Sequence, residues 1–126
     1  MFFNQNIFPT FFVSPLRIVG ICMTKNDYLK AGLGHFSTRN YALAITAFKS
    51  ALEIDPDFDL AINALAEVYS KSGLLDNALP LARKLVELNP EDPLAHAALS
   101  RIYMQMGMIP EAEKELAISN RLAQNS

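Results

Sequence analysis

The sequence predicts an all-α fold, an α-solenoid of three stacked helix-turn-helix units. Two observations lead to this prediction. First, Ala44, Ala78 and Ala112 stand 34 positions apart in similar surroundings, and a period of that size indicates stacked copies of one small unit. Second, each copy contains two stretches of apolar residues at helical spacing, separated by a short break. The three copies cover residues 25–58, 59–92 and 93–126.

The segment before the first unit, residues 1–24, differs in character. Five of the eight phenylalanines fall within its first 22 residues, where Arg17 is the only charged side chain. A secretory signal needs a basic start, an unbroken apolar run and a cleavage site with small residues, whereas Pro9, Pro15 and Arg17 interrupt this stretch. The interruptions and the short length also argue against a stable membrane span.

Three interpretations of residues 1–22 stay open. In the first, translation begins at Met23, two residues before the first unit. In the second, the segment is a disordered or weakly membrane-associating leader. In the third, it folds back over the apolar residues Leu29, Leu33 and Phe36. Deletion of the segment tests the third interpretation, which requires a change in stability or in peptide binding.

The first unit combines a helix that contains Gly32 with a helix that contains Ala44. We expect these small residues to lie where the two backbones cross, because larger side chains would hold the helices apart. Arg39 occupies the turn position that is glycine in the other two units. Asn40 beside it tolerates the left-handed region, so we expect Asn40 to take over that role. Pro56 ends the unit because proline cannot continue a helix.

The second unit shows the helical spacing most clearly. Its first helix carries apolar residues at i, i+3, i+4 and i+7, namely Ile62, Leu65, Ala66 and Tyr69. Its second helix has a similar set: Ala78, Leu79, Ala82, Leu85 and Val86. Gly73 suits the left-handed end of the first helix, and Asp76 is the expected N-cap of the second. Pro80 should strain the first turn after Asp76 unless that turn is loosened or the helix starts later.

Asp92 and Pro93 are the expected N-cap and first helical residue of the helix pair in the third unit. Ser100 should face Ala112 where the helices cross, as Ala66 faces Ala78 in the second unit. The last helix, from Pro110 to about residue 123, is rich in charged residues and can cap the array. Three apolar residues of this helix leave open the alternative of contact with a second chain in a homodimer: Leu116, Ile118 and Leu122.

These repeated positions resemble the tetratricopeptide repeat over residues 25–126. The resemblance implies a right-handed superhelical stack in which the first helices of the units line a concave groove that holds a peptide. Carried over position by position, the groove residues are Asn26, Leu29, Leu33, Phe36, Ser37, Leu60, Asn63, Glu67, Ser70, Lys71, Leu94, Ala97, Arg101, Met104 and Gln105.

One subclass of the family clamps the C-terminal carboxylate of heat-shock chaperones with lysine, asparagine and arginine. The matching positions in this chain are apolar and cannot bind a carboxylate: Leu29, Leu33, Ala64, Leu94 and Ala98. The resemblance therefore disfavours that class of partner. Which other peptide the groove holds is left open, because unrelated partners share this scaffold.

Composition and motifs argue against several other classes of function. The chain has 13 acidic and 11 basic residues, a net charge of -2, which gives no basic excess for nucleic acid. The single cysteine, Cys22, cannot form an internal disulfide. We find no phosphate-binding glycine loop, acid-base pair or metal-spaced cluster. The sequence therefore predicts neither enzymatic activity nor a cofactor.

The remaining chemistry-bearing residues have structural interpretations. His35 and His96 occupy positions that are tyrosine or isoleucine in other units, so we expect packing. A run of methionines suggests groove lining and core packing in preference to copper(I) binding: Met104, Met106 and Met108. Two pairs at i, i+4 are expected to support their helices, Glu67 with Lys71 and Arg83 with Glu87.

The sequence thus predicts a non-enzymatic, cytoplasmic interaction module that binds a peptide segment of a partner protein. The alternative is a structural element that self-assembles through exposed repeat ends.

Overall fold

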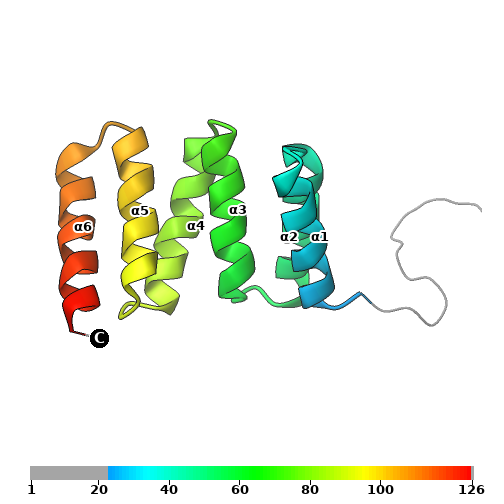
Figure 1. Cartoon of the computed structure of the whole chain (residues 1–126), viewed down its shortest axis with the longest axis horizontal. Helices are drawn as coiled ribbons and strands as arrows, with labels where there is room; N and C mark the ends of the chain where they lie inside the picture. Colours follow the sequence, from blue (N-terminus) through cyan, green and yellow to red (C-terminus); the bar gives the residue numbers. More distant parts are fainter. Residues whose placement is uncertain (1–22, 126) are drawn as a thin grey trace, which may run out of the picture.

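The structure, a computed structural model, describes residues 23–125, and the three interpretations of residues 1–22 lie outside this range. Within it the chain forms six α-helices and no strand, which confirms the predicted all-α repeat fold (Figure 1). The helices are α1 Lys25–Ser37, α2 Tyr41–Ile54, α3 Asp59–Lys71, α4 Leu75–Leu88, α5 Pro93–Gln105 and α6 Ile109–Gln124. Each pair falls within one of the three predicted units, whose boundaries stay a prediction.

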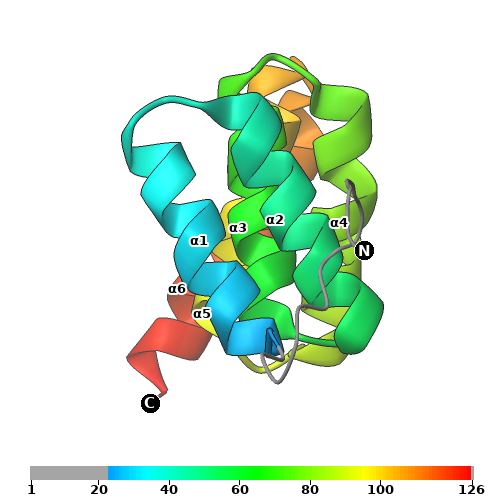
Figure 2. The ribbon, with the colours of Figure 1, turned by 90° about the vertical axis from the view of Figure 1, so that its right-hand side faces the viewer.

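Consecutive helices pack side by side, so that the three pairs follow one another along the long axis (Figures 1 and 2). The main cluster of buried side chains contains residues of α2, α3, α4, α5 and α6. The largest fully buried side chains of the described residues are Phe48 of α2 and Ile62 and Val68 of α3. Because these helices come from the first two units, the core joins the units as well as the helices within each unit.

The turn inside each unit contains one residue in the left-handed region. Gly73 and Gly107 both have φ 80°, as expected for glycine at a helix C-terminus. In the first unit Arg39 itself adopts φ 63°, so the prediction that Asn40 takes this role is wrong. Asn40 instead donates its backbone N–H to the His35 carbonyl at 2.8 Å, which is the bond that closes this type of turn.

The start of α4 also differs from the prediction. Asp76 is not the N-cap; α4 begins at Leu75, and the Leu74 carbonyl accepts the Ala78 N–H at 3.1 Å. Residues 40 and 108 accept in the same way in the other units, from Ala44 and Ala112. In each unit the residue directly after the left-handed residue is therefore the N-cap of the second helix, which starts one residue later. Pro80 lies in the second turn of α4, and the helix starts earlier, not later, than the proline led us to expect.

Two of the first helices have side-chain N-caps. Asp92 accepts the Leu94 N–H at 3.0 Å and Pro93 is the first residue of α5, which confirms the prediction. At α1 the Thr24 and Asp27 side chains form a capping box that sequence reasoning missed. Hydrogen bonds from the Thr24 backbone and side chain hold the pKa of the Asp27 carboxyl below its usual value.

The small residues lie in the interior as predicted, and the atoms nearest to the open side of Gly32 belong to Phe48. A Cβ atom at Gly32 would lie 2.4 Å from Cε1 of Phe48, so the Phe48 ring occupies the space that the glycine leaves open. Ala44, Ala66, Ala78 and Ala112 are buried. Ser100 is buried too, and its hydroxyl donates to the Ala112 carbonyl at 2.7 Å. This bond directly connects a side chain of α5 to the backbone of α6.

We expect Gly32→Ala to lower the free energy of unfolding by about 1–3 kcal/mol, because the added methyl group overpacks against Phe48. Gly34→Ala is the matched control in the same helix, since a Cβ there meets nothing within 4 Å. That control should stabilise the protein by roughly 0.5–1 kcal/mol through higher helix propensity. Urea denaturation of both variants measures the difference, and equal effects would contradict the packing at Gly32.

Arg39→Gly should raise the free energy of unfolding by roughly 0.5–1 kcal/mol, because glycine enters the left-handed region without the penalty of a Cβ atom. Asn40→Gly is the control, since Asn40 has φ -90° and gains nothing from glycine. Denaturant midpoints at constant m compare the two variants. If Asn40→Gly stabilised the protein and Arg39→Gly did not, the assignment of the left-handed conformation to Arg39 would be wrong.

Candidate functional site

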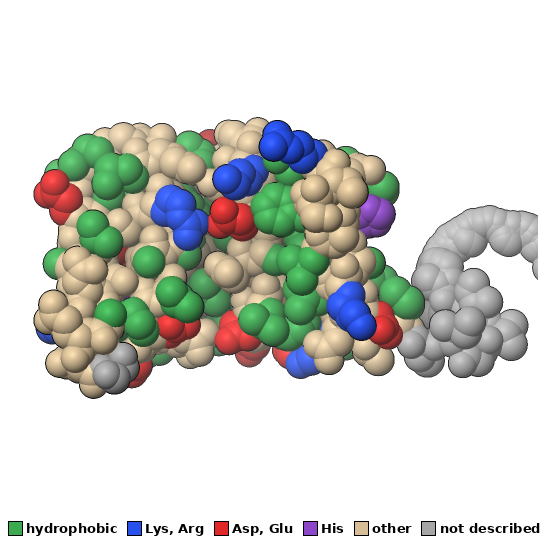
Figure 3. All heavy atoms as spheres, viewed as in Figure 1, with side chains coloured by type: hydrophobic (Ala, Val, Ile, Leu, Met, Phe, Trp, Pro, Cys, Tyr) green, Lys and Arg blue, Asp and Glu red, His purple; other side chains and the backbone are tan. Residues whose placement is uncertain are grey.

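The predicted groove residues lie on α1, α3 and α5, the first helices of the three pairs. We call the surface that these helices share the groove face. Large apolar side chains are exposed there: Leu33 at 46%, Leu60 at 58%, Leu94 at 75% and Met104 at 45% of their full area. Figure 3 shows hydrophobic side chains interspersed with charged ones over α3 and α5.

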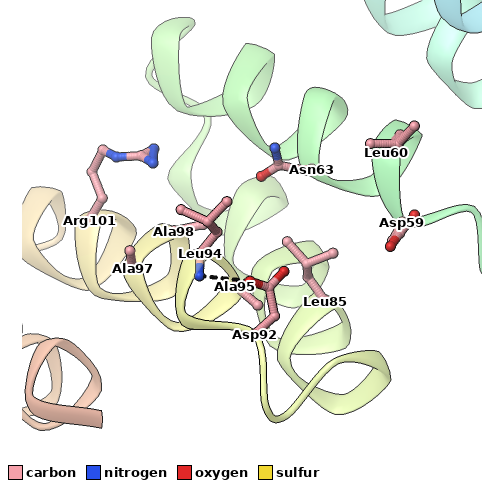
Figure 4. A pocket seen from close by; sticks show the side chains of 10 residues that line it. All are labelled: Asp59, Leu60, Asn63, Leu85, Asp92, Leu94, Ala95, Ala97, Ala98 and Arg101. Atoms are coloured by element: carbon pink, nitrogen blue, oxygen red, sulfur yellow. Dashed lines mark hydrogen bonds between the residues drawn. The ribbon is translucent and has the colours of Figure 1, made fainter. Parts of the chain in front are cut away.

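Two hollows open on the groove face. The first, of about 360 Å³, lies between α1 and α3 and is lined by Leu29, Leu33, Phe36, Leu60, Asn63, Ala64 and Glu67. The second, of about 260 Å³, lies between α3 and α5 (Figure 4). Its lining consists of Asp59, Leu60, Asn63, Leu85, Asp92, Leu94, Ala95, Ala97, Ala98 and Arg101. Leu60 and Asn63 belong to both, so α3 forms the ridge between the hollows.

Two polar contacts connect α3 to α5 at the groove face. Arg101 donates to Glu67 at 2.9 Å, and the Ser70 hydroxyl donates to Gln105 at 2.6 Å. The expected pairing of Glu67 with Lys71 is therefore wrong, because the carboxylate turns to the next unit. Lys71 is exposed and forms no ion pair within residues 23–125.

The structure brings only part of the predicted set together around the hollows. Asn26, Ser37, Ser70, Lys71, Met104 and Gln105 lie on the same three helices but line neither hollow. Sequence reasoning missed Asp59, Leu85, Asp92 and Ala95 as lining residues, and it placed Ala64 and Ala98 only among the positions of the carboxylate clamp. Asp92 was recognised only as an N-cap. Asp92 lines the hollow together with Leu85 of the preceding helix because of the way the units stack. The repeat pattern did not indicate that these two residues share a hollow.

A lysine at the start of α1 contacts the loop that leads into α3. Lys25 contacts Asp55 at 2.6 Å, and its ammonium group lies 4.6 Å from the centre of the Phe58 ring. The hydrogen bond from Lys25 holds the pKa of the Asp55 carboxyl below its usual value. Phe58 is buried directly before α3, so this contact links the start of α1 to the start of α3.

The histidines differ in their surroundings. His96 is buried, and both ring nitrogens face oxygen atoms: Nδ1 lies 2.7 Å from Oε1 of Glu115, and Nε2 lies 2.8 Å from the Pro90 carbonyl. This ring thus connects α5 to α6 and to the preceding loop, a polar role that was not foreseen. His35 is half-buried at the end of α1. Within residues 23–125 no three His, Cys, Asp or Glu side chains are grouped so as to hold a metal ion.

Among the other predicted contacts, the ion pair of Arg83 is replaced by a different partner, whereas the packing of the methionines is as predicted. Arg83 donates to the Tyr103 hydroxyl at 3.2 Å instead of pairing with Glu87. Met106 and Met108 pack against the core, as predicted. On α6, Leu116 is exposed, whereas Ile118 and Leu122 are half-buried. None of the helices formed by residues 23–125 is long and apolar enough to cross a membrane.

Comparison with known proteins identifies the repeat. Two family models, both described as tetratricopeptide repeat, match residues 28–58 and 71–126. No curated protein sequence matches the chain.

Solved structures share the fold at low sequence identity. A crystal structure of MamA superimposes with a TM-score of 0.77 at 21% identity, covering 82% of this chain and 60% of that one. The first TPR of Spaghetti (RPAP3), bound to the HSP90 peptide SRMEEVD, gives 0.76 at 17% identity and 86% coverage of both chains. The Sgt2 TPR domain from Aspergillus fumigatus gives 0.75 at 21% identity, covering 80% and 67%. This chain spans only 56–60% of four MamA chains.

We expect Glu115→Ala to lower the free energy of unfolding by about 1–3 kcal/mol, because it leaves Nδ1 of the buried His96 without its oxygen partner. Glu113→Ala, on the same helix but exposed, should change stability by less than about 0.5 kcal/mol. Chemical denaturation compares the two. A loss of the same size in both variants would show that helix α6 and not the histidine contact is responsible.

Proposed function

Because the chain belongs to the tetratricopeptide repeat family, we propose that it is a non-enzymatic interaction module whose groove face binds a peptide segment of a partner protein. The observation that supports this proposal most is the set of exposed leucines beside the two hollows, above all Leu94 with 75% of its area in solvent. Exposed apolar surface that flanks a concavity is typical of interaction sites. Burial of one such leucine by a ligand is worth up to about 1.5–3 kcal/mol.

The size of the hollows favours side chains of a segment over a small-molecule ligand. Their volumes, about 260 and 360 Å³, lie near or below the lower end of the range of roughly 300–1,000 Å³ that small-molecule pockets occupy. Two neighbouring hollows of this kind suit two anchoring side chains of one peptide. The helices that carry the lining residues are packed on the core, so the surface is held in shape before the ligand arrives.

The ridge between the hollows offers a contact for the peptide backbone. Asn63 is exposed on this ridge and lines both hollows, and no hydrogen bond of its side chain occurs with the other residues between 23 and 125. A side-chain amide presents a donor and an acceptor, the pair that a peptide unit requires. Asn63 can therefore bind the backbone of a segment whose side chains enter the hollows on either side.

The proposal does not extend to a chaperone C-terminal carboxylate. Although the Spaghetti domain is bound to an HSP90 peptide, the positions of the carboxylate clamp are apolar in this chain, and Ala64 and Ala98 are buried. Leu29, Leu33 and Leu94 likewise offer no hydrogen-bond donor in their side chains. We therefore propose a peptide that is recognised through internal side chains.

Asn63→Ala combined with Arg101→Ala should reduce partner capture by the full chain at least about tenfold, because both side chains lie at the groove hollows. Partner capture is measured by pull-down with equal amounts of bait, and thermal unfolding checks that the variant is folded. Lys49→Ala combined with Glu53→Ala is the control, since both residues are exposed on α2, away from the groove face.

Unchanged capture by the groove variant would move the site off the groove face. Capture of the chain by itself, abolished by changes at Leu116 and Leu122, would support the alternative of self-assembly through the last helix.

A further inference from the structure

The hollow between α3 and α5 combines apolar walls with a negatively charged rim. We propose that it takes a lysine or arginine side chain of the bound peptide, and that an apolar side chain of the same peptide enters the hollow between α1 and α3. This inference rests on the proposed function, since it concerns the same groove face. It names the chemistry of the partner segment: a basic residue close in sequence to an apolar one.

The interior of the α3–α5 hollow suits an aliphatic chain. Leu85, Ala95 and Ala98 are almost completely buried and line it, while Leu60 and Leu94 are exposed beside them. Lysine and arginine bury their methylene groups against such surfaces and keep the charged group at the edge. A long basic side chain therefore matches both the interior and the rim.

The rim carries two carboxylates without a cation. Figure 4 shows Asp59 and Asp92 on either side of Leu85. Asp92 accepts the Leu94 N–H at 3.0 Å, and Asp59 lies 3.5 Å from the Asn89 amide. Neither forms an ion pair with a lysine or arginine in residues 23–125. A purely apolar ligand that covered this rim would desolvate both carboxylates without compensation, whereas a basic side chain would compensate them.

The opposite end of the hollow does not offset this charge. Arg101 lines the hollow there, but its guanidinium is 2.9 Å from the Glu67 carboxylate. Acidic side chains gather along the edge where α3 and α5 begin, at the bottom of Figure 3. The site therefore attracts a cationic segment and repels an anionic one.

The neighbouring hollow has the complementary character. Leu29, Leu33, Phe36 and Ala64 make most of its lining apolar, and its one charged residue, Glu67, is engaged by Arg101. Since Leu60 belongs to both hollows, the two anchors of a peptide must enter on opposite sides of this one side chain. The basic and the apolar anchor are therefore expected within a few residues of each other.

The test selects 12-residue peptides from a random displayed library on the full chain and measures the binding of synthetic versions by fluorescence anisotropy. We expect enrichment of lysine or arginine next to leucine, isoleucine or phenylalanine. Asp59→Asn with Asp92→Asn should weaken binding at least tenfold, and higher salt should weaken binding to the unaltered chain. Asparagine is nearly isosteric and keeps the N-cap of α5, so the fold is retained.

Glu87→Gln with Glu91→Gln is the matched control, because it makes the same change in charge at exposed residues outside the hollow. Its effect should stay below twofold. Selected peptides that lack basic residues would overturn this inference and leave the proposed function standing. The same conclusion would follow if the peptides bound the aspartate variant with unchanged affinity but no longer bound the Asn63 and Arg101 variant. Peptides that bound both variants with unchanged affinity would overturn this inference and the proposed function together. If peptides were selected only by a chain that lacks residues 1–22, that segment would be the occupant of the hollow, and the inference would be overturned.

Discussion

The close approach of the two helices within each unit is the constraint on which the rest of the structure depends. It requires a position without a bulky side chain on the first helix, and the chain supplies Gly32, Ala66 and Ser100. In the first unit the Phe48 ring fills the space beside the glycine, and in the third the Ser100 hydroxyl bonds to the backbone of the facing helix. Packing at this density leaves little tolerance for added atoms.

This inward packing determines what the groove face can display. One side of α3 and α5 fills the interior with side chains such as Ile62, Val68 and Leu99. The opposite side leaves Leu60 and Leu94 exposed, and these two leucines line the hollows. Contacts between neighbouring units, such as Arg101 with Glu67, then hold the helices at a fixed spacing. The surface is thus a consequence of the stacking and is formed before any ligand binds.

Two of the charged residues on the groove face stand at helix starts, and the stacking of the units also makes them part of a hollow. An aspartate at the start of a helix is favoured because it interacts with free backbone N–H groups. Asp92 satisfies this rule as the N-cap of α5, and Asp59 lies in the first turn of α3. Stacking brings both to the rim of one hollow. Residues chosen for helix starts can in this way also give a groove its electrostatic preference.

The sequence by itself determined the features that depend on local interactions: six helices, the left-handed Gly73, and Asp92 with Pro93 at the start of α5. Spacing and capping act within a few residues, so the printed order of amino acids contains them. Only the tertiary structure decided that Arg39 takes the left-handed conformation and that Glu67 pairs with Arg101 instead of Lys71. Those outcomes depend on how the helices of a unit pack and how the units stack. The repeat pattern does not specify the distances between helices that result.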